Sequence, residues 1–405
     1  MSFRTNDCQQ ISLNDKLMNL TEREKKALNK SWAKVFADEI FPAIDEERFS
    51  VLYSDKASRP DTPVNVIIGA LIIKELSDKT LSRFRKRCYD HETLHGVDLY
   101  RDCVKDLSGK IAKIMKLNGR IRRMDFMMIE SNIRFLSRME LIYTCISKLI
   151  VYLTKNASDK VSEQLKHYAD SNDYNRIFYH QRNDDMENII QMLLTDSDSL
   201  LEICKTDFEE VTEYQLFVRC LSEQTVVENE KRRLRTKEDG TMNSSALQNP
   251  SDPDATYRKK SGKLYRGYAA NLEETVGKNG SVITDYQFDK NTHTDSHFLQ
   301  DTLSAMEKSE EEIILITDGG YDGQDNIALA KEKNVKLVTT ALARLRNGVE
   351  TIPANIRKNY HLDKLPRGKQ RGKFFFGSKI AALNFRKLFG FRKGLGNYAP
   401  NPVLV

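Results

Sequence analysis

Three acidic residues that are far apart in the chain, Asp125, Asp318 and Glu350, are of the type and placement that could act together. Asp125 lies within a stretch of alternating Met and Phe that predicts a strand, and Asp318 ends the apolar stretch 313–316 before two glycines. Glu350 begins a predicted helix. Converging carboxylates repel one another unless a cation holds them, and oxygen ligands suit Mg²⁺. Two such ions about 3.5–4 Å apart can activate an attacking oxygen and stabilise a leaving one in phosphodiester chemistry.

Each acid also has a simpler interpretation. Asp318 followed by two glycines is typical of a turn. Asp125 follows two arginines and is typical of a surface ion pair. Glu350 is typical of an acid at the positive end of a helix. Other acids near the predicted strand ends are interpreted as helix caps or supporting groups, with Asp295 the strongest rival: Glu130, Asp285, Asp295 and Asp322. The joint arrangement, with basic segments on both sides, favours the catalytic interpretation.

The order of the predicted elements brings these acids to one edge of a sheet. A strand, a helical insertion, then strand, strand, helix, strand, helix, strand and helix predict an α/β fold (α+β overall) with a mixed sheet flanked by helices. This order is that of an RNase H-like fold, whose parallel strands present sites at their carboxyl ends. The predicted parts are a helical DNA-binding region (1–120), a catalytic core (121–132 and 256–356), a helical insertion (133–234), a loop (235–255) and a basic C-terminal tail (357–405).

Positive charge is concentrated in a few segments although the net charge is only +6. Residues 357–393 carry twelve Lys or Arg and one acid, and residues 108–124 carry six and none. A helix pair within 62–88 with a basic second helix is a helix-turn-helix candidate. Such charge favours an anionic partner, DNA or RNA, over a merely solvated face. The residues expected to contact DNA are Arg83, Arg85, Lys86, Arg87, Arg120, Arg122, Arg123, Arg357, Lys358, Arg367, Lys369, Arg371 and Lys373.

Composition excludes several other classes. With 405 residues, 40% of them hydrophobic and 30% charged, the chain is typical of a globular protein with two or three domains. No stretch approaches the roughly 18 apolar residues of a membrane span, and the N-terminus has no apolar signal core. Six cysteines without C-x-x-C spacing indicate reduced thiols in a cytosolic protein.

Several blocks together resemble transposases of bacterial insertion sequences in the DDE superfamily. They include RRMDFMMIESNIRFLSRMELIYTC, LQNPSDPDATYRKKSGKLYRGYAANLEE, VITDYQFDKNTHTDSHFLQDTL, ILITDGGYDG and the stretch from RNGVE to FRKLF. The resemblance covers about residues 59–391. It implies an RNase H-like catalytic core behind a helical DNA-binding region, Mg²⁺ or Mn²⁺ as ions, and catalytic roles for Asp125, Asp318 and Glu350. The segments at Leu76/Ser77 and 343–346 are shorter here than is usual in the family.

The sequence thus predicts a DDE-type transposase that cleaves DNA at transposon ends with two Mg²⁺ (or Mn²⁺) ions and transfers strands into target DNA. We expect it to bind terminal inverted repeats as a homodimer or larger assembly, in the bacterial cytoplasm at the nucleoid. Two alternatives remain open: a catalytically inactive or domesticated DNA-binding protein of the same fold, and a structure-selective nuclease on the same core.

Overall fold

The computed structural model describes residues 3–6, 20–53, 62–74, 82–179, 183–205, 207–240, 243–260, 262–339, 353–354, 356–357 and 364–394. Its centre is a mixed sheet in which β1, β7 and β8 are parallel, while β5 is antiparallel to β1, β4 and β6. The spatial order is β4-β5-β1-β7-β8, with β6 beside β5 and a short β9 beside β1. The strands are β1 (Ile121–Ser131), β4 (Thr256–Lys260), β5 (Lys263–Gly277), β6 (Gly280–Lys290), β7 (Ile313–Thr317), β8 (Val335–Thr339) and β9 (Lys364–Leu365). The predicted mixed sheet flanked by helices, in an RNase H-like arrangement, is confirmed.

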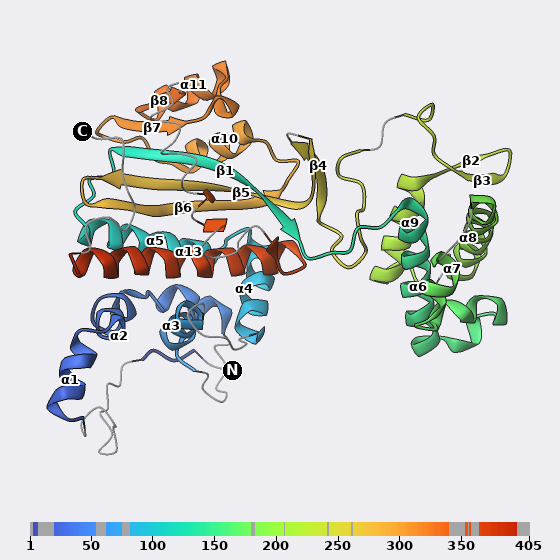
Figure 1. Ribbon diagram of the computed structural model, residues 1–405, viewed down its shortest axis with the longest axis horizontal. Helices are drawn as coiled ribbons and strands as arrows, with labels where there is room; N and C mark the ends of the chain where they lie inside the picture. The colour runs from blue at the N-terminus through green and yellow to red at the C-terminus, as the bar shows by residue number, and fades with distance from the viewer. Residues whose placement is uncertain are drawn as a thin grey trace.

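The central strand β1 is apolar on both sides because both faces of the sheet are covered. Met124, Phe126 and Met128 join one core, which includes Phe298 of α10. Met127 and Ile129 alternate with them and join the other core. Figure 1 shows α5 and α13 running along one side of the sheet, with α10 and α11 near β7 and β8. These helices are α5 (Leu99–Ile114), α10 (Asp295–Ala305), α11 (Gln324–Glu332) and α13 (Lys369–Arg392).

The segment expected to be a basic tail forms the long helix α13, and this part of the prediction differs from the structure. Fourteen of its residues are buried, among them Phe374, Phe376 and Ile380. Its Gly377 lies so close to Tyr286 of β6 that an added Cβ would be 2.1 Å from the phenol oxygen. The aromatic residues among the lysines are therefore core residues, which the charge count concealed.

Buried polar groups fix α13 to the sheet. Lys387 Nζ donates to Glu274 Oε1 at 2.8 Å, and Arg123 Nη2 lies 3.1 Å from the other oxygen of that carboxylate. Asn384 Nδ2 donates to the Ile283 carbonyl at 2.7 Å, and its Oδ1 accepts from the Ile283 N–H at 3.0 Å. Ile283 adjoins a β-bulge in the β5–β6 pairing, so the side-chain amide bonds backbone groups of an irregular edge strand.

The predicted helical insertion after β1 has its own core and lies to one side of the sheet in Figure 1. Its elements are α6 (Arg138–Asn156), α7 (Asp173–Phe178), α8 (Asn183–Cys204), α9 (Thr212–Gln224) and a hairpin of β2 (Thr225–Glu228) and β3 (Lys231–Leu234). The predicted loop that follows is anchored at two points in its second half. Leu247 is buried in the insertion core, and the buried Asp252 accepts hydrogen bonds from Ser131 and Tyr268 of the sheet.

The N-terminal region is helical, as predicted. Its helices are α1 (Glu22–Asn29), α2 (Trp32–Val35), α3 (Val64–Lys74) and α4 (Ser82–His95). Phe84 and Cys88 of α4 are buried in the same core as α13. The five cysteines within the described ranges are free and buried, and no helix in those ranges is long and apolar enough to cross a membrane.

Candidate active site

Asp125 lies on β1, and Asp318 directly follows the neighbouring parallel strand β7. β1 and β7 pair at Arg122↔Leu315 and Arg123↔Ile316, and Asp125 and Asp318 each follow two residues after this last pair. Neighbouring strands are about 4.8 Å apart, so the two carboxylates start from adjacent backbone positions. Asp125 is 7% exposed, and its Oδ1 accepts from the Phe126 N–H at 2.8 Å. Two of the three predicted acids thus come from β1 and from the residue that follows β7, its parallel neighbour.

The turn that carries Asp318 is fixed to the sheet by a buried tyrosine, Tyr321. Asp318 Oδ1 accepts from the Gly320 N–H at 2.9 Å, which begins a short 3-10 turn. Tyr321 is fully buried, and its hydroxyl donates to Asn271 Oδ1 on β5 at 2.6 Å. Asn326 Nδ2 donates to the Tyr321 carbonyl at 2.7 Å. Burial raises the pKa of Tyr321 well above its usual value, and the charges of Asp125, Asp295 and Asp318 raise it further.

Asp295, the strongest rival in the sequence, also lies beside Asp318. It is the first residue of α10 and is 7% exposed; Thr294, not Asp295, caps the helix by accepting from the His297 N–H. A Cβ built on Gly320 would be 2.7 Å from Asp295 Oδ2 and 3.1 Å from Asp318 Oδ1. Burial raises the pKa of the Asp295 carboxyl. The positive charges of Lys260 and Arg258 act to lower this pKa, and the negative charge of Asp318 raises it.

The other competing acids have partners elsewhere. Asp285 lies on β6, where Arg101 and Lys105 of α5 pair with it. Glu130 is 2.9 Å from Lys263 Nζ, and Asp322 is exposed with its Oδ1 accepting from the Gly323 N–H. Glu350 lies outside the described residues. Within the described part of the chain no three His, Cys, Asp or Glu side chains form a group that could hold a metal ion.

Six of the thirteen predicted DNA contacts are buried or paired with acids. Arg85 and Arg123 are buried, and Arg123 faces Glu274. The other ion pairs are Arg120–Glu311, Arg122–Glu273, Lys369–Asp289 and Lys373 with Glu92 and Asp98. For the buried ones, a structural role explains their presence without DNA, because an ion pair compensates the desolvation of a buried charge.

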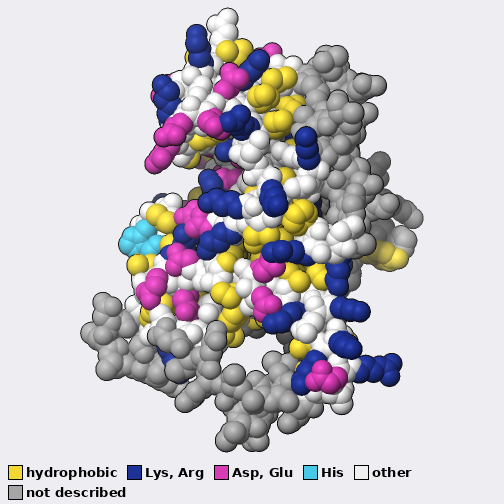
Figure 2. Space-filling model, turned by 90° about the vertical axis from the view of Figure 1, so that its left-hand side faces the viewer, with side chains coloured by type: hydrophobic (Ala, Val, Ile, Leu, Met, Phe, Trp, Pro, Cys, Tyr) yellow, Lys and Arg dark blue, Asp and Glu magenta, His cyan; other side chains and the backbone are white. Residues whose placement is uncertain are grey.

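The remaining predicted contacts differ in exposure. Lys86, Arg357, Arg367 and Arg371 are exposed; Arg367 donates to the Asn132 carbonyl. Arg87 is half-buried, with its guanidinium 4.8 Å from the centre of the Tyr53 ring. Lys358 and the side chain of Arg83 lie outside what the structure describes. On the face in Figure 2, Lys and Arg side chains are mixed with Asp and Glu instead of forming one continuous patch.

Sequence reasoning missed a basic hairpin beside the acids. Residues 256–267, across β4 and the start of β5, contain five Lys or Arg and no acid. Arg258 and Lys260 both lie 4.9 Å from the centre of the Phe126 ring, next to Asp125 in sequence, and Arg258 Nη2 is 3.5 Å from Asp295 Oδ1. The repeated cations of YRKKSGKLYR were a usable signal, but the Asn, Ser and Pro before them favoured a loop.

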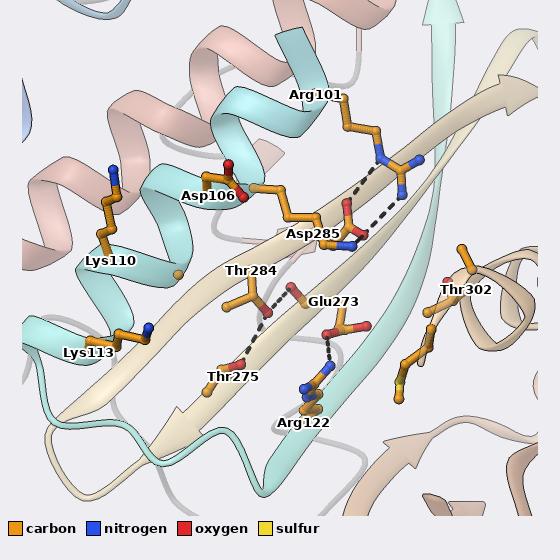
Figure 3. A pocket seen from close by; sticks show the side chains of 14 residues that line it. Arg101, Asp106, Lys110, Lys113, Arg122, Glu273, Thr275, Thr284, Asp285 and Thr302 are labelled. Carbon is orange, nitrogen blue, oxygen red and sulfur yellow. Dashed lines mark hydrogen bonds and ion pairs between the residues drawn. The ribbon is translucent and has the colours of Figure 1, made fainter. Parts of the chain in front are cut away.

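A cleft of about 460 Å³ lies between α5, β6 and α10. Figure 3 shows two ion pairs among its charged side chains, Arg101 with Asp285 and Arg122 with Glu273. The Thr275 and Thr284 hydroxyls are 3.1 Å apart. Because both carboxylates already have cationic partners, this cleft is a less suitable place for a metal than the edge at Asp318.

Residues 233–383 match the family model described as Transposase DDE domain, and this match supports a DDE-family transposase. The matched range includes Asp318 and Glu350, whereas Asp125 precedes it. Neither the curated proteins nor the solved structures gave a match.

Proposed function

We propose that this transposase hydrolyses phosphodiester bonds at transposon ends and joins the freed strand to target DNA, with Asp125, Asp318 and Glu350 as its catalytic acids. The observation that supports the proposal is the parallel β1–β7 pairing, whose last pair, Arg123↔Ile316, comes two residues before Asp125 and Asp318 in their segments. Carboxylate oxygens are suitable ligands for Mg²⁺ or Mn²⁺, and two acids from adjacent strands can share a pair of ions.

Burial of the segment after Glu350 supports its assignment as the third acid. Pro353 and Ile356 are buried, and Ile356 belongs to the core on the α5 and α13 side of the sheet. Alternation along β1 sends Asp125 to this same face, because its neighbours Met124 and Phe126 face α10. The chain following Glu350 therefore returns to the side on which Asp125 lies.

The residues of the chain have separate tasks in this reaction. Asp125, Asp318 and Glu350 would hold two divalent ions, which when bound supply activation of the attacking oxygen and charge stabilisation for the leaving one. Tyr321 and Asn326 keep the Asp318 turn in one position, which limits reorganisation. The cations of the β4–β5 hairpin are placed to bind phosphates of the strand that is cut.

DNA away from the cut site would be held by exposed lysines and arginines. Lys113, Lys116 and Arg120 are exposed where α5 ends and β1 begins, and Lys86, Arg357 and Arg371 are exposed elsewhere. Phosphate contacts of this kind position a duplex without reading its sequence. We propose that the terminal repeats are bound by a homodimer or larger assembly.

Cleavage of DNA carrying the element's own ends tests the proposal. We expect Mg²⁺-dependent cleavage by the natural chain and loss of cleavage, with DNA binding retained, in Asp125→Asn, Asp318→Asn and Glu350→Gln. Asp322→Asn, an exposed acid four residues from Asp318, is the matched control and should cleave normally. Cleavage that survives Asp318→Asn would contradict the three-acid assignment. Binding without cleavage by the natural chain would instead favour an inactive DNA-binding protein.

A further inference from the structure

We propose that Asp295 is a further carboxylate of the metal site, acting with Asp318 on the same divalent ion or pair of ions. The inference rests on the proposed function, because it concerns the site that the catalytic acids form. It adds a residue from α10 to Asp318, which directly follows β7.

The first observation is the closeness of the two carboxylates. The Asp295 and Asp318 oxygens lie 2.7 and 3.1 Å from the one point where a Gly320 side chain would begin. The sum of these distances is the largest separation that the two oxygens can have. A two-ion site, with ions about 3.5–4 Å apart and Mg–O bonds of about 2.1 Å, spans such a separation.

The second observation is that Asp295 is buried without full compensation. Its side chain is 10% exposed, and Oδ1 has no hydrogen-bond partner among the described residues. The nearest cation, Arg258 Nη2, is 3.5 Å away and belongs to a guanidinium that also lies over Phe126. A buried carboxylate next to another carboxylate is costly unless something else neutralises it. A divalent cation supplies that neutralisation.

The glycine between the two acids has a matching role. Gly320 leaves open the space where its side chain would meet Asp295, whereas a Cβ on the adjacent Gly319 would meet nothing within 4 Å. Neither glycine has a positive φ, so alanine is tolerated by the backbone at both positions. Gly320→Ala therefore tests the space that Asp295 and Asp318 share, and Gly319→Ala controls for a general effect on the turn.

The competing explanation is structural. Asp295 occupies the first turn of α10, where an acid favours the helix dipole, and Arg258 could be its partner. On that explanation Asp295→Asn lowers the melting temperature of the metal-free protein and leaves metal binding unchanged. On ours, removal of a poorly compensated buried charge leaves the metal-free melting temperature unchanged or raises it, and metal binding weakens.

The experiment is Mn²⁺ binding to the full chain without DNA, followed by electron paramagnetic resonance of free Mn²⁺ and by the Mn²⁺-induced rise in melting temperature. We expect Asp295→Asn and Gly320→Ala to weaken Mn²⁺ binding by about tenfold or more, as loss of a group at a metal site typically does. Asp318→Asn should weaken it at least as much. Gly319→Ala and the charge control Asp322→Asn should bind Mn²⁺ like the natural chain.

The outcomes separate this inference from the proposed function. Natural affinity in Asp295→Asn together with weakened binding in Asp318→Asn overturns the role of Asp295 and leaves the catalytic acids in place. Equal weakening in Asp322→Asn and Asp295→Asn overturns it as well, because the effect would then be general charge. Absence of Mn²⁺ binding by the natural chain, or full binding by Asp318→Asn, contradicts both proposals.

Discussion

The buried ion cluster between α13 and the sheet predicts that two single substitutions lower the free energy of unfolding by very different amounts. Arg123, Glu274 and Lys387 are 3%, 3% and 8% exposed, so one carboxylate balances two cations in the core. Glu274→Gln leaves both cations without a counter-charge. Lys387→Met leaves a neutral pair, Arg123 with Glu274. We expect the first to be far more destabilising than the second.

The geometry sets the magnitudes. Removing one partner of a buried pair typically costs about 3–5 kcal/mol, and we expect Glu274→Gln to fall in this range because Arg123 has no other ion pair among the described residues. Lys387→Met loses a charge-assisted hydrogen bond of 2.8 Å, worth about 1.5–3 kcal/mol, but also removes the desolvation penalty of a buried ammonium. We expect its net cost to stay below about 2 kcal/mol.

The pH dependence has a definite sign. Burial acts to raise the pKa of Glu274, but Lys387 and Arg123 outweigh it, so the pKa lies below its usual 4.5. A carboxyl whose pKa is lowered in the folded state stabilises it above the unfolded pKa, and this contribution is lost as pH falls through the folded pKa. The difference between the natural chain and Glu274→Gln should therefore be full near neutral pH and shrink in acid.

Urea unfolding followed by tryptophan fluorescence measures these differences. Trp32 is the only tryptophan, and its ring packs edge-on at 6.2 Å against Phe385 of α13, so its emission follows the α13 layer. Lys379→Met is the control, since this half-buried lysine of the same helix lies over Phe375. An equal or larger loss in Lys387→Met than in Glu274→Gln would refute the reasoning that Lys387 is the surplus cation.

Three further results are expected. Asn384→Ala leaves the N–H and carbonyl of Ile283 without their partner, so the free energy of unfolding should fall by about 2 kcal/mol or more in the same urea experiment; an unchanged midpoint would contradict it. Gly377→Ala should lower the free energy of unfolding by about 1–3 kcal/mol, because its Cβ would collide with the Tyr286 hydroxyl. Tyr286→Phe alone should be near neutral, because that hydroxyl has no hydrogen-bond partner in the described ranges. In the double variant, Tyr286→Phe should partly rescue Gly377→Ala. The logarithm of the affinity for duplex DNA, measured by fluorescence anisotropy, should fall linearly with the logarithm of salt concentration, and a flat dependence would contradict phosphate binding by the exposed cations.

The sequence determined the type and order of most of the central elements. The alternation along residues 121–131 and the apolar stretch before Asp318 predict strands because burial on both faces imposes its own pattern on local sequence. The same local patterns placed Asp125 within one strand and Asp318 at the end of another. The helical insertion was also predictable, since its helices have their own apolar periodicity and core.

Only the tertiary structure decided which charges face water and which acids meet. The many lysines of the α13 segment predicted a basic tail. Lys387 is nevertheless buried, because Glu274, far away in sequence, compensates its charge. Asp295 and Asp318 belong to different elements, and their meeting at Gly320 depends on how α10 packs beside β7. Burial and pairing are properties of contacts between distant segments, and no local pattern encodes them. The sequence therefore supplied the carboxylates, and packing decided which of them can share an ion.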